Sequence, residues 1–237
     1  KYIYAYETGL SSDPEMNWRL SALDKLTLLS NSDAHSPNNI GREATAMEIS
    51  EPITYQKIYN NIKDKKGIVE TIEFYPEEGM YHFDGHRDCK FSCEPSESRK
   101  LKNICPICKK PLVIGVLNRV EELADRALGY RPKNAPAFKK LVELDKIIAE
   151  ALNIKSRASK AVQKEYSLWI NRFGSELHIL LNLDLDKINE VLDARVVEGI
   201  RRVREGRLNI EPGFDGQYGR VKVFSSDNKM NYQKTLL

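Results

Sequence analysis

The chain has 237 residues, of which 41% are hydrophobic, and it carries 37 Lys and Arg against 34 Asp and Glu. This length suits one large domain or two to three small ones with real apolar cores. No apolar run is long enough to cross a bilayer, and the first residues lack the basic and then apolar pattern of a secretory signal. The sequence therefore predicts a cytoplasmic protein with no membrane partner.

The charge is unevenly distributed along the chain. Residues 1 to 85 carry 8 Lys and Arg against 14 Asp and Glu, residues 86 to 172 carry 19 against 10, and residues 173 to 237 carry 10 against 10. An acidic segment followed by a basic one suits a metal site beside a surface that binds a polyanion. A lysine-rich solvated surface of a heat-stable protein explains the same charges equally well.

Residues 1 to 67 have the pattern of the last part of an α/β domain. Hydrophobic spacing predicts strands at 2–6, 27–30 and 44–49 and helices at 18–23 and 54–65. The chain opens on Lys1 directly in a strand-like run, and we interpret it as a fragment.

The candidate reaction chemistry lies just after the strand at 27–30. Asp33 and His35 follow this strand, in the position where α/β enzymes place their reacting groups. Because the two residues are two apart, both side chains point the same way in an extended segment, as two ligands of one metal would. For a bare Asp-x-His the simpler interpretation is a turn-capping aspartate beside an ordinary histidine.

Residues 68 to 130 are predicted to form a small β-rich domain. Segments 68–75 and 80–83 are typical of strands and are joined by a hairpin signal at 76–79. The four cysteines, with spacing Cys-x3-Cys, eleven residues, then Cys-x2-Cys, are Cys89, Cys93, Cys105 and Cys108.

The cysteine spacing favours one structural zinc ion. Without a secretion signal disulfides are disfavoured, and a redox Cys-x2-Cys leaves the first pair unexplained, although unrelated buried cysteines stay an alternative. Four thiolates fill a tetrahedral shell, so this metal would stabilise the domain and not react with substrate. The Cys-x3-Cys spacing is long for such a site, and His82 and His86 are close enough to be substitute ligands.

Residues 131 to 237 are predicted to form a mainly helical domain, to which the resemblance described below assigns DNA binding. A helix opening at a capping box at 118–121 precedes an extended linker at 130–137. Helical stripes then begin at Leu144 and Val162, weaker helices follow at 186–192 and 194–204, and a Gly-rich turn leads to a final strand. We assign Trp169 to packing, and we take Lys160 and Arg201 as candidate phosphate contacts. No Gly-x4-Gly-Lys phosphate loop occurs, so the sequence does not support ATP-driven unwinding.

Two stretches carry a resemblance to a known family. Ser-Asp-Ala-His-Ser at 32–36, followed by Gly41-Arg42, is similar to the last metal-ligand motif of the polymerase and histidinol phosphatase (PHP) phosphoesterases. The run from Glu7 to Leu20 and the cysteine block narrow this resemblance to one branch, endonuclease Q, over essentially the whole chain.

The resemblance implies a fold, a metal site and an activity. The first 67 residues would be the C-terminal part of a distorted α/β barrel, with Asp33 and His35 as catalytic ligands of two or three divalent ions (Zn²⁺, Mg²⁺ or Mn²⁺). The family's earlier His-x-His motif is missing, so we expect this fragment to bind catalytic metal poorly and to cut little. The intact protein would hydrolyse DNA on the 5′ side of uracil, hypoxanthine, xanthine or an abasic site.

Candidate substrate contacts near the metal motif are Ser12, Asn17 and Arg19, which have suitable hydrogen-bond donors and acceptors. Extrusion of the damaged nucleotide would be required, and replication or repair proteins are candidate partners. Two other functions remain open. A PHP phosphatase of a small phosphate ester explains Asp33 and His35 but neither the zinc module nor the basic middle segment. In a non-catalytic DNA-binding or scaffolding module, the zinc and the helices would only position a partner.

Overall fold

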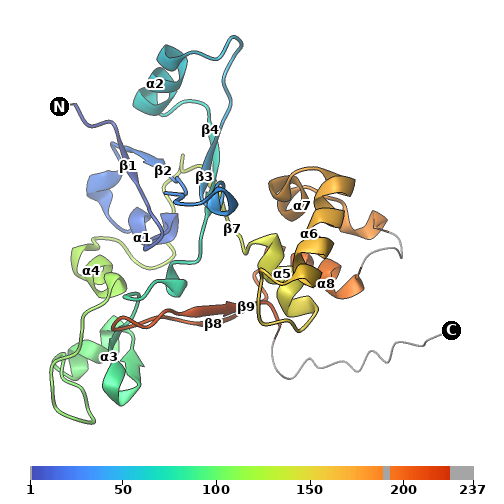
Figure 1. Ribbon diagram of the computed structural model, residues 1–237. Helices are drawn as coiled ribbons and strands as arrows, with labels where there is room; N and C mark the ends of the chain where they lie inside the picture. The colour runs from blue at the N-terminus through green and yellow to red at the C-terminus, as the bar shows by residue number, and fades with distance from the viewer. Residues whose placement is uncertain (1, 189–192, 225–237) are drawn as a thin grey trace. The chain divides into compact units, whose positions relative to one another are not determined.

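The computed structural model describes residues 2–188 and 193–224 (Figure 1). The chain divides into two compact units, Lys1–Val142 with Glu211–Arg220 and Glu143–Ile210 with Val221–Leu237. They are called unit 1 and unit 2. No helix in these described ranges is long and apolar enough to span a bilayer.

Unit 1 contains three small sheets with helices between their strands. Its helices are α1 (Pro14–Trp18), α2 (Tyr55–Asp64), α3 (Pro95–Lys100) and α4 (Val116–Leu123). Its strands are β1 (Ala5–Glu7), β2 (Thr27–Leu29), β3 (Ala44–Met47), β4 (Ile68–Glu73), β5 (Asp84–His86), β6 (Phe91–Cys93) and β7 (Ala137–Lys140). The mixed α/β class is confirmed, but the strands of the described residues form separate small sheets and no closed barrel.

The central sheet of unit 1 has the order β3-β4-β7, with β3 antiparallel and β7 parallel to β4. The hairpin expected between 68–75 and 80–83 is absent, since the described neighbours of β4 are β3 and β7. This sheet takes strands from all three expected domains and crosses both expected boundaries, at 67/68 and 130/131. The expected linker at 130–137 ends in the first residue of β7. This strand pairs with β4, some 67 residues earlier in the chain, and a pairing over that separation produces no local sequence pattern.

Unit 2 has a helical core. Its helices are α5 (Leu144–Ala151), α6 (Lys160–Phe173), α7 (Glu176–Leu181) and α8 (Ala194–Arg204). The Ser159 hydroxyl accepts the Val162 N–H at 3.3 Å and so begins α6, and Gly174 ends this helix with a φ of 88°. Trp169 is fully buried, so its assignment to packing is confirmed.

The short helix expected at 186–192 differs from the structure, whereas the expected Gly-rich turn and final strand are present. In place of the helix expected at 186–192, residues Leu185–Lys187 form a short 3-10 turn, and residues 189–192 lie outside the described residues. The Gly-rich segment joins β8 (Asn209–Glu211) to β9 (Arg220–Lys222), which form a two-stranded sheet.

Candidate metal centre and the Asp33 cavity

A cavity lies where the two strands of the first sheet end. Because β1 and β2 are parallel, their carboxyl ends meet at one edge, and the segments that follow them enclose a volume of about 460 Å³. Its lining residues are Glu7, Gly9, Leu10, Asn31 and Asp33. Asp33 is exposed and has a φ of 42°, a left-handed conformation that aspartate tolerates better than most residues.

Hydrogen bonds from backbone and hydroxyl groups hold the segments that follow β1 and β2 in place. After β1, Thr8 donates its N–H to the Leu29 carbonyl at 3.1 Å. After β2, the Thr45 hydroxyl accepts the Ser30 N–H at 2.8 Å and donates to the Ser30 carbonyl at 2.9 Å. The Ser30 hydroxyl donates to the Ile72 carbonyl at 2.8 Å. The sheet of β3 and β4 therefore fixes the point from which the Asp33 loop leaves.

Asp33 and His35 both lie on this exposed loop, but only Asp33 lines the cavity. Within the described residues the two do not belong to any group of three or more metal-binding side chains. Their role as catalytic ligands stays a prediction.

The candidate substrate contacts of the first segment are used within the protein. The Ser12 hydroxyl donates to the Thr8 carbonyl at 2.7 Å, and the Asn17 amide donates to the Ser12 hydroxyl at 3.0 Å. Arg19 is 6% exposed and forms an ion pair with Glu121. The hydrogen bond from Arg19 holds the pKa of Glu121 below its usual value. These contacts give Arg19 a structural role. No local sequence pattern predicts its partner Glu121, which lies 102 residues away.

The candidate phosphate contacts lie in unit 2. Lys160 is the exposed first residue of α6. Arg201 of α8 is half-exposed and pairs with Asp186 at 2.7 Å. Within the described residues Lys160 forms no ion pair and its side chain is exposed to solvent. Both residues stay candidates for a phosphate contact.

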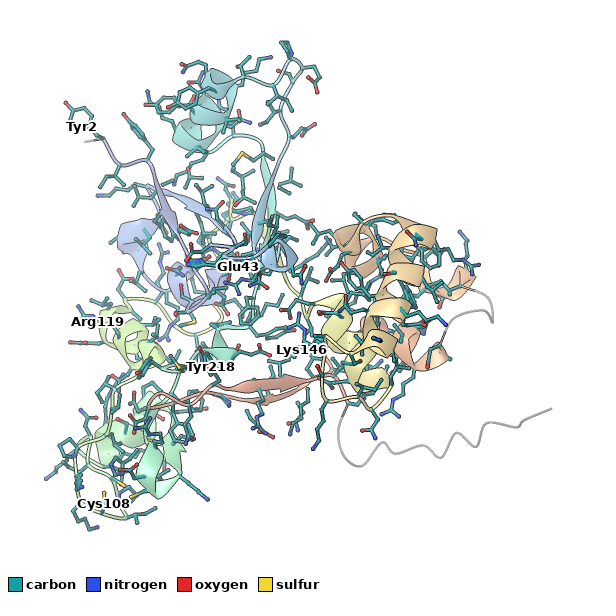
Figure 2. The ribbon with its side chains drawn as sticks, in the orientation of Figure 1. Tyr2, Glu43, Cys108, Arg119, Lys146 and Tyr218 are labelled. Atoms are coloured by element: carbon teal, nitrogen blue, oxygen red, sulfur yellow. The ribbon has the colours of Figure 1, made fainter. Side chains whose placement is uncertain are left out.

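A possible metal centre forms between β5 and the turn before residue 111. The ligand atoms of His86, Cys89, Cys105 and Cys108 all lie within 4.8 Å of one another. The Cys108 sulfur is 3.4 Å from His86 Nδ1. Figure 2 labels Cys108 among the sulfur atoms of this small module. Three thiols and one imidazole are a donor set that zinc takes in closed, structural sites.

The fourth member of this group differs from the expectation. His86 takes the place expected for Cys93, which lies on β6 opposite Asp84 and packs in an apolar cluster with Cys105 and Leu112. Burial raises the pKa of the Cys93 thiol to about 11 and that of the Cys89 thiol to about 12, so the positions of the two sulfurs, and not their pKa values, distinguish these cysteines. The cysteine count alone suggested four thiolates, and only the unusual Cys-x3-Cys spacing pointed to a histidine.

The backbone around Cys105 favours its thiolate. Burial raises the pKa of Cys105, but the N–H groups of Cys108 and Ile107 point at its sulfur, and the net result is a pKa lowered to about 7. This arrangement is what a metal-binding turn requires, because the thiolate is the form that binds metal. Four protein ligands would leave no open position for substrate, which indicates a stabilising role.

Two solved structures are similar to this chain over nearly its whole length. The crystal structure of the lesion-specific endonuclease Q from Pyrococcus furiosus superposes with a TM-score of 0.83 at 31% identity, over 98% of this chain and 58% of that one. The chain resembles endonuclease Q. A second endonuclease Q structure, in complex with a 27-mer duplex substrate that has an abasic lesion at the active site, gives a TM-score of 0.79 at 30% identity, over 99% of this chain and 59% of that one.

Sequence relatives of this endonuclease Q-like chain are longer than the chain itself. A family described as the MJ0043 C-terminal domain matches residues 143–207, most of the helical core of unit 2. The protein MJ0043 of Methanocaldococcus jannaschii is 34% identical over 221 residues, which cover 91% of this chain and 28% of that protein. YqxK of Bacillus subtilis is 27% identical over 222 residues, which cover 93% of this chain and 53% of that protein. The chain thus spans from about a quarter to about a half of these relatives.

Proposed function

We propose that this chain is part of a DNA repair endonuclease that hydrolyses the phosphodiester on the 5′ side of deaminated bases or abasic sites. The observation that carries the proposal is its likeness to endonuclease Q over nearly its whole length at 31% identity. In one of those structures the active site holds an abasic lesion of a duplex. The deaminated bases in question are uracil, hypoxanthine and xanthine.

The proposal assigns catalysis to one site and stabilisation of the fold to another. Asp33 would bind a catalytic divalent ion at the cavity after β2, and His35 would join it as a ligand from the same loop. Such ions activate a water and neutralise the charge of the phosphodiester under attack. The zinc held by His86, Cys89, Cys105 and Cys108 would keep its module folded beside the DNA.

The test is a nicking assay with the natural protein that contains these residues. End-labelled duplexes carry one uracil, hypoxanthine, xanthine or abasic site, and matched undamaged duplexes serve as controls, each with and without Mg²⁺ or Mn²⁺. We expect a metal-dependent nick on the 5′ side of each lesion that leaves a 3′-hydroxyl. We expect far slower nicking by residues 1–237 alone, because two catalytic ligands, Asp33 and His35, would hold the metal ions weakly.

Equal cutting of damaged and undamaged duplexes would contradict lesion recognition. Release of phosphate from small esters, with no salt-sensitive binding of duplex DNA, would favour the phosphatase instead, since an enzyme for small esters has no reason to displace many counterions.

A further inference from the structure

Two buried glutamates face each other inside unit 1. Ala44 of β3 pairs with Ile72 of β4, so the next antiparallel position sets Glu43 opposite Glu73, on the same face of the sheet. Glu43 is 2% exposed and Glu73 is fully buried. Figure 2 labels Glu43 beside these strands. Two like charges directly opposite each other in a sheet are destabilising, and burial increases the cost.

Each carboxyl group has one oxygen with a hydrogen-bond partner and one without. Glu43 Oε1 accepts the Phe74 N–H at 3.3 Å, and Glu73 Oε2 accepts the Thr8 hydroxyl at 3.2 Å. Glu43 Oε2 and Glu73 Oε1 are buried without a partner. Unsatisfied buried carboxylate oxygens are costly, so this pair needs a positive charge or a proton.

The charged and titratable groups around the pair supply too little positive charge. Arg42 lowers the pKa of Glu43, but its Nε donates to the Ser32 carbonyl at 3.1 Å. Lys140 is engaged by Asp13 at 2.6 Å. Three further ionisable neighbours add no positive charge. The charge of Glu7 raises the pKa of Glu43, the charge of Asp13 raises the pKa of Glu73, and the charge of Glu73 raises the pKa of Tyr6.

We infer that Glu43 and Glu73 share one proton and act as a positioning pair for the segments that line the Asp33 cavity. A proton held between the two unpartnered oxygens would satisfy both atoms at once and leave one negative charge near Arg42. The paired carboxyl groups then keep Glu73 as the acceptor for Thr8, the residue between Glu7 and Gly9 in the cavity wall.

Electrostatics supports the shared proton. Burial, and then the charge of Glu73, raises the pKa of Glu43 to about 7. Burial raises the pKa of Glu73 to about 7 as well, against the hydrogen bond from Thr8. Both folded-state values lie above the usual 4.5. The proton therefore contributes stability that is fully present below pH 4.5 and is lost as the pH rises to about 7.

The direct test needs no enzymatic activity. Glu73→Gln mimics the proton-sharing state, because its amide can donate to Glu43 and its carbonyl can accept from Thr8. Glu43→Gln is the reciprocal variant, and Glu51→Gln, at an exposed position, is the matched control. Infrared spectroscopy at pH 7 should show a protonated carboxyl band in the wild type and in Glu51→Gln that both other variants lack.

Thermal unfolding gives the second readout. Between pH 4.5 and 7 the melting temperature of the wild type should fall by at least about 4 °C more than that of Glu73→Gln. Equal pH dependence of the two proteins, or no protonated carboxyl band, would overturn the shared proton. So would Mg²⁺, Ca²⁺ or Mn²⁺ that stabilises the wild type and not Glu73→Gln, because a cation would then occupy the pair.

The positioning role rests on the proposed function and is tested by a separate experiment. In the nicking assay, Glu73→Gln should keep activity within about threefold and lose any wild-type fall in kcat between pH 6 and 8. Glu73→Ala, which leaves Thr8 without its acceptor, should lose at least about tenfold in kcat. Equal activity of the two variants would overturn the positioning role. A wild type that does not nick would overturn the proposed function and leave the infrared and thermal tests of the pair intact.

Discussion

At the scale of single residues, the local environment decides which of several similar side chains joins the group that could hold a metal ion. Cys89 and Cys93 are equivalent in a sequence pattern, and both pack in the apolar cluster of Cys105 and Leu112. Of the two, Cys89 is the one whose sulfur lies within 4.8 Å of the ligand atoms of His86, Cys105 and Cys108. The sequence therefore predicted three of the four members of the metal group and identified the fourth only as a substitute. The missing information was the β5–β6 pairing, which sets where each residue of the Cys-x3-Cys run lies.

Zinc content separates the two cysteines. Purified Cys93→Ala should keep about one zinc per chain, because its sulfur is not a ligand. Cys89→Ala and His86→Ala should each lose most of the zinc, since three ligands hold the ion far more weakly than four. Atomic emission spectroscopy after dialysis measures this difference. Zinc loss in Cys93→Ala with zinc retained in His86→Ala would show four-cysteine binding instead.

At the scale of elements, the start of α4 shows that a local sequence pattern can predict a helix without predicting its first residue or its cap. A capping box at 118–121 predicted a helix that begins at Asn118. The observed helix begins at Val116, where the Gly115 N–H donates to buried Asp84 Oδ1 at 2.7 Å and the Asn118 amide donates to its other oxygen. The capping carboxylate comes from β5, so the element was predictable and its cap was not.

Substitution of Asp84 tests this cap. Asp84→Ala leaves the Gly115 N–H and the Asn118 amide without a buried acceptor and should lower the free energy of unfolding by about 1–3 kcal/mol. Asp84→Asn keeps one acceptor oxygen and should lose less. Urea denaturation monitored by circular dichroism measures both. Equal stability of Asp84→Ala and the wild type would mean that α4 is capped by other groups.

At the scale of the whole molecule, the sequence predicted the α/β beginning, the metal-binding module and the helical end. It did not predict that one sheet joins β3, β4 and β7, because parallel pairing across a long connection has no local signature. Nor did it predict the division into two units, in which Glu211–Arg220 returns to unit 1. The Asp33 cavity was located by its motif, while Glu7 and Leu10, which line it with Asp33, were not singled out as site residues.

The most direct measurement of the central claim compares binding and cutting of one abasic duplex by the wild-type protein and by Asp33→Asn. Asparagine keeps the size of the side chain but removes the charge that would bind a catalytic cation at the cavity. The account predicts a loss of nicking of at least about a hundredfold with duplex affinity unchanged within about threefold. Full nicking activity in Asp33→Asn would contradict it.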